Sequence, residues 1–173
     1  MKKCIKINKC LACGNKKLKK ILDLFKQPLA NSFTVTKFQR EEKYPLVVYA
    51  CLKCMHLQLG HCVNPKLIYR NYIYVTNNTK TYKTYLKNFA NKCVSKFKKI
   101  KPKTVLDIGC NDGAQLNFFK MLGLKTFGID PAKNLLKISS KKHKIICDFV
   151  NQKSIGKIKK KIDIISAQNS FAH

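Results

Sequence analysis

Arginine is nearly absent from this 173-residue chain, although the chain is strongly basic. Arg40 and Arg70 are the only arginines among 36 basic residues, which face eight acidic ones and give a formal net charge of +28. Nucleic-acid interfaces favour arginine, because its guanidinium group makes paired hydrogen bonds to phosphates and base edges. The lysines are instead spread evenly from Lys2 to Lys161. We interpret the charge as a solvated background, typical of an AT-rich genome, with only nonspecific attraction to nucleic acid; a true polyanion site is the alternative.

Long apolar stretches are absent as well. No segment approaches the roughly 20 apolar residues that a membrane span needs. The lysines that follow Met1 do not lead into the apolar block of a signal peptide. We therefore expect a cytoplasmic protein without a membrane partner. In that compartment nine cysteines favour metal ligands and buried thiols over disulfides.

The sequence pattern divides the chain into three zones. Residues 1–75 combine cysteines with short apolar runs, as in a small β-rich module held by a metal. Residues 76–102 have an apolar residue at every third or fourth position, which predicts a linker helix capped by Thr79 or Thr81. Residues 103–173 alternate between strand and helix patterns, which predicts parallel strands in right-handed βαβ units. The predicted fold class is α/β, a β-rich module followed by a partial Rossmann-like sheet. The expected strands are 104–108, 125–129, 145–147 and 162–167, and the expected helices are 114–122 and 132–140.

Two C-x-x-C pairs stand out among the cysteines. Cys10 and Cys13 form the first pair, and Cys51 and Cys54 form the second. A two-residue gap lets both thiolates of a pair reach one ion at about 2.3 Å, and two pairs complete the tetrahedron that zinc prefers. Four thiolates leave no open coordination position, so we predict a structural Zn²⁺. Redox-active or unliganded thiols are the alternative.

The segment 105–113 is the most informative part of the chain. An apolar strand runs into Gly109 and a helix follows Gly113, an arrangement that directs backbone N–H groups at a ligand. Asn111 occupies the second glycine position of a dinucleotide fingerprint, where its side chain would obstruct a pyrophosphate. S-adenosyl-L-methionine has no pyrophosphate but carries an ammonium and a sulfonium group. Those cations suit Asp107 at the end of the strand.

Further acids follow the next two strands. Asp130 lies 23 residues beyond Asp107, in place to accept both hydroxyls of a ribose. Asp148 and Phe149 follow the third strand and are placed to flank an adenine, although a solvated loop acid is the alternative for Asp148. We therefore predict S-adenosyl-L-methionine as the cofactor. The residues predicted from this pattern to bind it are Asp107, Gly109, Asn111, Asp112, Gly113, Asp130 and Asp148.

The order of these parts resembles a known family. The string Gln27-Pro-Leu-Ala-Asn-Ser-Phe33 lies between the cysteine pairs and Leu57-Gln-Leu59 follows the second pair, as in the zinc-binding N-terminal domain of the sugar-nucleotide C-methyltransferases. The segments 107–113, 128–131 and 169–173 resemble that family's cofactor-domain motifs in the same order. The resemblance implies a class I methyltransferase domain and a nucleotide-linked ketosugar as substrate, whose negative charge would suit the basic chain.

The resemblance also assigns residues to the reaction. In this family a base removes the acidic proton next to a ketosugar carbonyl, and the resulting enolate attacks the sulfonium methyl group. His173 matches the histidine of the family's N-x-x-A-H segment. That segment begins at Asn169, and the resemblance implies that Asn169 contacts the cofactor. Tyr72 or Tyr74 matches the active-site tyrosine region. A frayed chain end and ordinary core packing are the respective alternatives.

Two other interpretations of the chain stay open. An RNA methyltransferase with an N-terminal zinc knuckle would share the cofactor loop but leaves the string 27–33 unexplained. A non-catalytic remnant or binding module is the second. The family's sheet continues beyond its fourth strand, so the resemblance implies a truncated chain with little activity. The sequence indicates neither the sugar nor the oligomeric state.

Overall fold

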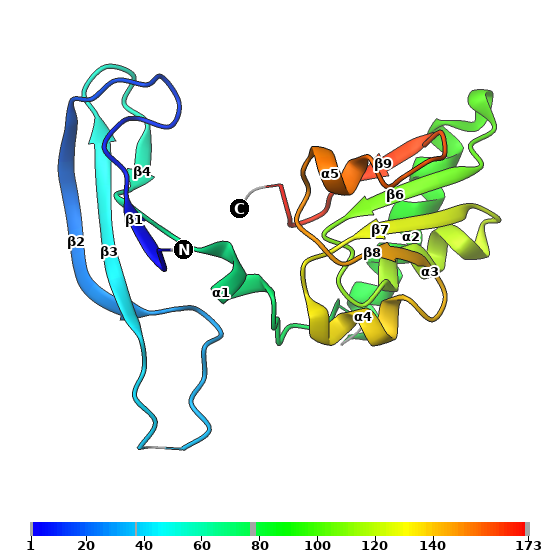
Figure 1. Cartoon of the computed structure of the whole chain (residues 1–173). Coiled ribbons are helices and arrows are strands. Elements are labelled where there is room, and N and C mark those ends of the chain that lie inside the picture. Colours follow the sequence, from blue (N-terminus) through cyan, green and yellow to red (C-terminus); the bar gives the residue numbers. More distant parts are fainter. Residues whose placement is uncertain (1, 37, 77–78, 172–173) are drawn as a thin grey trace. The chain divides into compact units, whose positions relative to one another are not determined.

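The computed structural model describes residues 2–36, 38–76 and 79–171. These residues belong to two compact units, Met1–Tyr69 and Arg70–His173 (Figure 1). Each unit has its own sheet structure. None of the helices in the described ranges is long and apolar enough to span a bilayer.

The first unit is the β-rich module that the sequence predicts. Its elements are β1 (Cys4–Lys6), β2 (Leu18–Pro28), β3 (Lys43–Cys51), β4 (Leu57–Leu59), β5 (His61–Val63) and the short helix α1 (Pro65–Tyr69). β1 pairs with β5, and the other strands form an antiparallel sheet in the order β2-β3-β4. Among the described residues of this unit the buried apolar side chains are few: Cys10, Tyr44, Val47, Ala50 and Cys51. A core this small needs an additional link such as a metal.

The second unit alternates helices and strands. Its elements are α2 (Lys80–Lys96), η2 (Lys98–Ile100), β6 (Thr104–Ile108), α3 (Ala114–Met121), β7 (Lys125–Ile129), α4 (Lys133–Ser139), β8 (Lys144–Ile146), α5 (Gln152–Ile155) and β9 (Ile164–Ser166). The predicted linker helix corresponds to α2. Thr79 caps it, because the Thr79 hydroxyl accepts a hydrogen bond from the backbone N–H of Tyr82 (3.2 Å).

The four strands of this unit form a parallel sheet in the order β8-β7-β6-β9. The chain leaves β6 toward β7 on one side and later returns to β9 on the other side. Strand order therefore reverses at β6, and ligands of open parallel sheets bind at the carboxyl ends of the strands at such a point. The α/β class predicted from the sequence is confirmed.

Buried side chains cover both faces of this sheet. On one face, Val105 of β6 packs with Ala90 of α2 and with Leu116 and Phe119 of α3. Phe89 meets Phe119 edge to face, with ring centroids 6.4 Å apart. On the other face, a second cluster of Leu106, Phe127 and Ile129 packs against Ile158 and Ile162. This packing fixes where β6 and β7 end, and thus where the loops that follow them lie.

Candidate functional site

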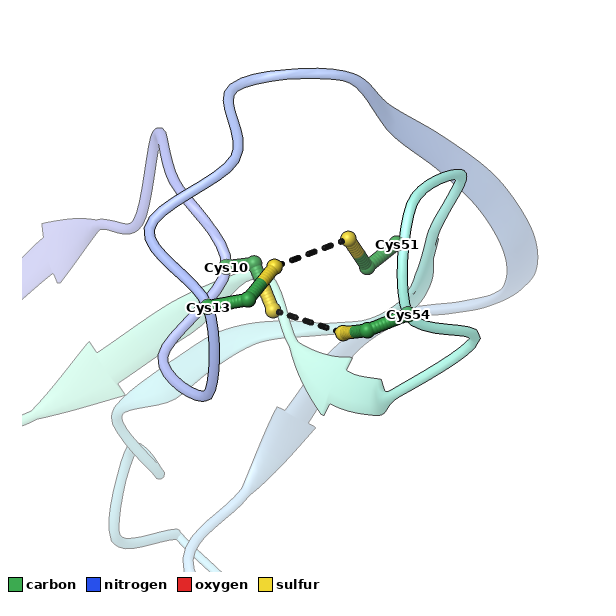
Figure 2. Close-up of side chains that lie close together, drawn as sticks. All are labelled: Cys10, Cys13, Cys51 and Cys54. Carbon is green, nitrogen blue, oxygen red and sulfur yellow. Dashed lines mark hydrogen bonds between the residues drawn. The ribbon is translucent and has the colours of Figure 1, made fainter.

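The four cysteines of the two C-x-x-C pairs converge in the first unit. Figure 2 shows Cys10 facing Cys54, with 3.7 Å between the sulfurs, and Cys13 facing Cys51 at 3.6 Å. All four sulfurs lie within 4.8 Å of one another. Ligands at about 2.3 Å from a tetrahedral zinc ion are roughly 3.8 Å apart, whereas a disulfide would need about 2.05 Å. The separations match a zinc tetrahedron, and the four residues form a structural zinc site.

The two pairs lie on turns of the same design. The backbone N–H of Gly14 donates to the carbonyl of Cys10 (2.9 Å), and the N–H of Met55 donates to the carbonyl of Cys51 (3.0 Å). Gly14 has a φ of 73° and Met55 a φ of 58°, so both occupy the left-handed region. Glycine adopts that conformation without steric cost, whereas methionine pays a cost because its Cβ crowds the following carbonyl oxygen. The second turn is therefore the more strained of the two.

Ionisation of the cluster shows why it needs a cation. Backbone N–H groups of Cys54 and Lys53 and the amide of Asn15 point at the Cys51 sulfur and lower the pKa of that thiol to about 6. At Cys54 the N–H of His56 lowers the pKa, but the neighbouring thiols and burial outweigh it and raise the pKa to about 12. Thiolates this close repel one another, so all four ionise only around a metal ion.

A buried glutamine braces the first turn. Gln58 of β4 is only 7% exposed. Its Oε1 accepts from the N–H of Leu11 (2.8 Å), and its Nε2 donates to the carbonyl of Lys9 (3.1 Å). The sequence motif Leu57-Gln-Leu59 includes this residue, but its role as a brace of the metal site follows only from the structure.

In the second unit, the loop that follows β6 starts at a glycine whose conformation and surroundings disfavour any side chain. Gly109 has a φ of 72°, and its N–H donates to the carbonyl of Ile129 (2.8 Å). A Cβ at this position would lie 2.6 Å from the Cβ of Ser170. The Ser170 hydroxyl donates to the carbonyl of Ile108 (2.8 Å). The segment after β9 is thereby held directly against the loop.

Asp107 lies beneath this loop, at the end of β6. Its side chain is buried and accepts a hydrogen bond from the hydroxyl of Ser166 on β9. Burial, with a smaller contribution from the nearby Asp130 charge, raises the pKa of Asp107 to about 7 against the opposing effect of the Ser166 hydroxyl. A buried carboxyl group with this pKa gains most from a cationic ligand, because the cation favours its ionised form.

Asp130 follows β7, beside the loop. Its two carboxylate oxygens accept from the N–H of Asn111 and the N–H of Ala132, each at 2.8 Å. Burial raises the pKa of Asp130, while these two N–H groups lower it. A carboxylate has about four lone-pair positions, so the two bonds leave half of its acceptor capacity for a ligand.

Asp112 and Gly113 shape the start of α3. The carboxylate of Asp112 accepts from the N–H of Ala114 (3.0 Å). Gly113 has a φ of 81°, and a Cβ there would lie 2.9 Å from the ring of His143. His143 is itself buried and bonded to Thr126 (2.7 Å). These two of the predicted cofactor residues thus set the conformation of the loop.

The tyrosines predicted for the active site lie in an extended segment, residues 70–76, which we call the strap. Its backbone is bonded to the second unit at every second residue. The bonds join Arg70 O to Lys133 N (3.0 Å), Tyr72 N to Asn134 Oδ1 (3.0 Å), Tyr72 O to Asn134 Nδ2 (2.8 Å), Tyr74 O to Asn111 Nδ2 (3.0 Å) and Thr76 N to Asn111 Oδ1 (3.0 Å). The strap therefore brings Tyr72 and Tyr74 to the ends of β6 and β7.

Asp148 is paired rather than fully solvated. Its Oδ1 accepts from Arg70 Nη2 (3.3 Å) and from the N–H of Phe149 (2.8 Å). The Arg70 guanidinium also lies 5.4 Å from the centre of the Phe149 ring. Arg70 therefore occupies the neighbourhood in which the sequence predicts an adenine.

A further tyrosine lies close to these groups. Asn169, with a φ of 51°, points its side-chain amide at the hydroxyl of Tyr82 (3.5 Å). Burial raises the pKa of Tyr82, the Asn169 amide lowers it, and the nearby Tyr74, Tyr85 and Asp107 add to the increase. In the sequence, Tyr82 falls within the predicted linker helix, residues 76–102, and carries no signal of a role at the site. The predicted base, His173, lies outside the described residues.

Comparison with known proteins identifies the relatives of this chain. Residues 10–69 match the model of a putative zinc binding domain, Methyltransf_13. The chain is also 26% identical to the C-methyltransferase NovU of Streptomyces niveus over 136 residues, which are 78% of this chain. The chain is therefore similar to a C-methyltransferase and, over residues 10–69, to a putative zinc binding domain. It spans about a third (32%) of the length of NovU.

Solved structures with partial similarity are methyltransferases. The plantazolicin methyltransferase BpumL in complex with SAH is 24% identical, with a TM-score of 0.37 over 47% of this chain and 33% of that one. The amino pentose methyltransferase CalS10 of Micromonospora echinaspora, bound to SAM, is 14% identical, with a TM-score of 0.39 over 55% of this chain and 44% of that one.

The four zinc residues were all predicted from their spacing, and the structure brings them together. Asp107, Gly109, Asn111 and Asp130 likewise meet at the ends of two neighbouring strands. Three participants were not predicted as site residues. Gln58, Asn134 and Arg70 act through bonds to segments far away in the chain. Their partners follow only from the fold.

Proposed function

We propose that this chain binds S-adenosyl-L-methionine between Asp107 and Asp130, and that the protein methylates a carbon of a nucleotide-linked ketosugar. The observation that carries the proposal is the convergence of the buried Asp107 and the half-buried Asp130 beside the turn at Gly109, where the parallel strands β6 and β7 end. That position is the ligand-binding edge of such a sheet.

The residues present fit this cofactor. Asp107 offers a buried carboxyl group to its ammonium or sulfonium charge, and Asp130 keeps acceptor capacity for ribose hydroxyls. Asn111 fills the position that a dinucleotide would need as glycine, and its side chain is already bonded to the strap. A small, cationic nucleoside therefore suits the site better than a dinucleotide.

Relatives and charge support a sugar nucleotide as the substrate. NovU is a C-methyltransferase, and the +28 net charge of this chain attracts a diphosphate-linked sugar. In the proposed reaction a base takes the proton from the carbon next to the ketone. The resulting carbanion forms a bond to the methyl group supplied by the cofactor, and S-adenosyl-L-homocysteine leaves. The aromatic strap residues Tyr72 and Tyr74, with His173, are the side chains that we assign to this step.

Calorimetry with S-adenosyl-L-homocysteine tests the cofactor site. Asp130→Ala should weaken binding by about 1.5–3 kcal/mol, the range for hydrogen bonds to a charged group. Asp23→Ala is a matched control, because Asp23 is an acid of the first unit, bonded to Lys20. Equal affinity of the Asp130 variant and the wild type would refute the site. Transfer of a labelled methyl group to nucleotide-linked ketosugars, with RNA as the comparison substrate, tests the substrate class.

A further inference from the structure

Two asparagine side chains hold the strap across the edge of the sheet where β6 and β7 end. Asn134 bonds to both backbone groups of Tyr72, at 3.0 and 2.8 Å. Asn111 accepts from the N–H of Thr76 and donates to the carbonyl of Tyr74, each at 3.0 Å. A side-chain amide has one acceptor and one donor group, so each asparagine replaces the bonds that a neighbouring strand would make.

The two asparagines differ in the elements to which they belong, and only Asn111 is bonded to an acid of the cofactor site. Asn134 belongs to helix α4. Asn111 belongs to the loop after β6, where its own N–H donates to the carboxylate of Asp130 (2.8 Å) and its Oδ1 accepts a second bond from Asp112 (2.9 Å). Asn111 therefore has one bond to an acid of the cofactor site and two bonds to the strap.

The backbone of Asn111 suits this double role. Its φ of 52° is left-handed, a conformation that asparagine tolerates better than most residues. Glycine would adopt it as easily but has no amide to hold the strap. This explains in physical terms why the second position of the loop is asparagine in this chain.

We propose that Asn111 is a positioning residue that couples occupancy of the cofactor site to the order of the strap. The proposal rests on the proposed function. A ligand that engages Asp130 fixes the loop, and the Asn111 amide passes that order to Tyr74 and Thr76. The aromatic segment is then held more firmly at the site when the cofactor is bound. By linkage, the strap must strengthen cofactor binding by the same factor as the cofactor protects the strap.

Amide hydrogen exchange on the zinc-loaded chain, with and without S-adenosyl-L-homocysteine, tests this coupling. In the wild type the ligand should slow exchange of the Thr76 amide by about tenfold, the factor expected for about one hydrogen bond. Asn111→Gly keeps the loop conformation but removes the amide. It should abolish this protection and weaken ligand binding by the same factor.

Two further variants make the result specific. Asn134→Ala, the matched control, should speed exchange at Tyr72 in both states but leave the ligand effect at Thr76 intact. Asn111→Asp keeps the acceptor for Thr76 but loses the donor to Tyr74, so it should retain part of the protection. This variant also tests the coupling if Asn111→Gly fails to fold. Ligand-induced protection that persists in Asn111→Gly would overturn the coupling. Binding without any protection in the wild type would overturn it too, whereas absence of binding would refute the proposed function itself.

Discussion

Cofactor binding should release a proton from Asp107. With a pKa of about 7, this carboxyl group is about half protonated at pH 7 when no ligand is bound. An adjacent cation lowers the pKa of a carboxyl group by roughly 1–3 units. Binding of S-adenosyl-L-methionine should therefore release about 0.4–0.5 proton at pH 7, about 0.4–0.9 at pH 6 and about 0.1 at pH 8.

Calorimetry in buffers with different heats of ionisation measures this number directly, because the observed enthalpy depends linearly on the buffer's enthalpy. The slope is the number of protons released. Asp107→Asn removes the titrating group while keeping an acceptor for the Ser166 hydroxyl, so its slope at pH 6 should fall to near zero. A wild-type slope near zero at pH 6, with tight binding, would refute the assignment of Asp107 to the cationic part of the ligand.

Three further predictions concern stability. Elemental analysis should find one zinc per chain. Cys51→Ser should lose both the zinc and the fold of the first unit, because Cys51 is one of four ligands that together contribute about 10 kcal/mol or more of metal-binding free energy. The control Cys62→Ser should retain both, because Cys62 is not a ligand. Met55→Gly should raise the free energy of unfolding by about 1 kcal/mol and Gly14→Ala should lower it by about as much, measured by denaturant titration; equal effects of the same sign would contradict the strain argument. His143→Gln should remove one source of acid destabilisation, so that the variant gains stability relative to the wild type as pH falls from about 6.5 to 4: burial, together with Lys120 and Lys142, lowers the pKa of His143 to about 4, and the wild-type imidazole therefore opposes folding in acid. A variant whose stability depends on pH in the same way as that of the wild type would count against this.

Much of the second unit could be predicted because its strands are short apolar runs between clear helix patterns. The strands at Thr104–Ile108 and Lys125–Ile129 have the predicted bounds. The last strand is shorter than the predicted 162–167, and the structure gives the reason. The carboxylate of Asp163 accepts from the N–H groups of Lys103 and Thr104, so side-chain bonds replace the first rungs of the ladder.

In the first unit, the long strand β2 could not be predicted from the hydrophobic pattern of the sequence. β2 runs from Leu18 to Pro28 with mostly exposed side chains, so neither alternation nor an apolar run marks it. Its pairing with β3 determines it, including irregular register between Lys20 and Leu22 and between Asp23 and Lys26. Tertiary pairing overrides local preference here, as is common for strands.

The candidate site divides in the same way. Acids and glycines at strand ends are visible in a sequence because their types are unusual there. The strap is different, since its residues are held by backbone groups that every sequence has. Tyr72 and Tyr74 were assigned by resemblance, but Asn111 and Asn134 hold them in place, and neither side chain signals that role.

The pH dependence of stability follows from two buried groups with opposite effects. Asp107, whose pKa rises from 3.8 to about 7 on folding, binds more protons in the folded state, so it lowers stability as pH rises through that window. His143, whose pKa falls from 6.5 to about 4, binds fewer protons in the folded state and raises stability over nearly the same window. Each slope is at most about 1.4 kcal/mol per pH unit, and the two largely cancel between pH 4 and 6.5. A flat wild-type profile is therefore no sign that the groups are solvated. The free energy of unfolding should rise with pH in Asp107→Asn, which retains only the His143 effect. It should fall with pH in His143→Gln, which retains only the Asp107 effect.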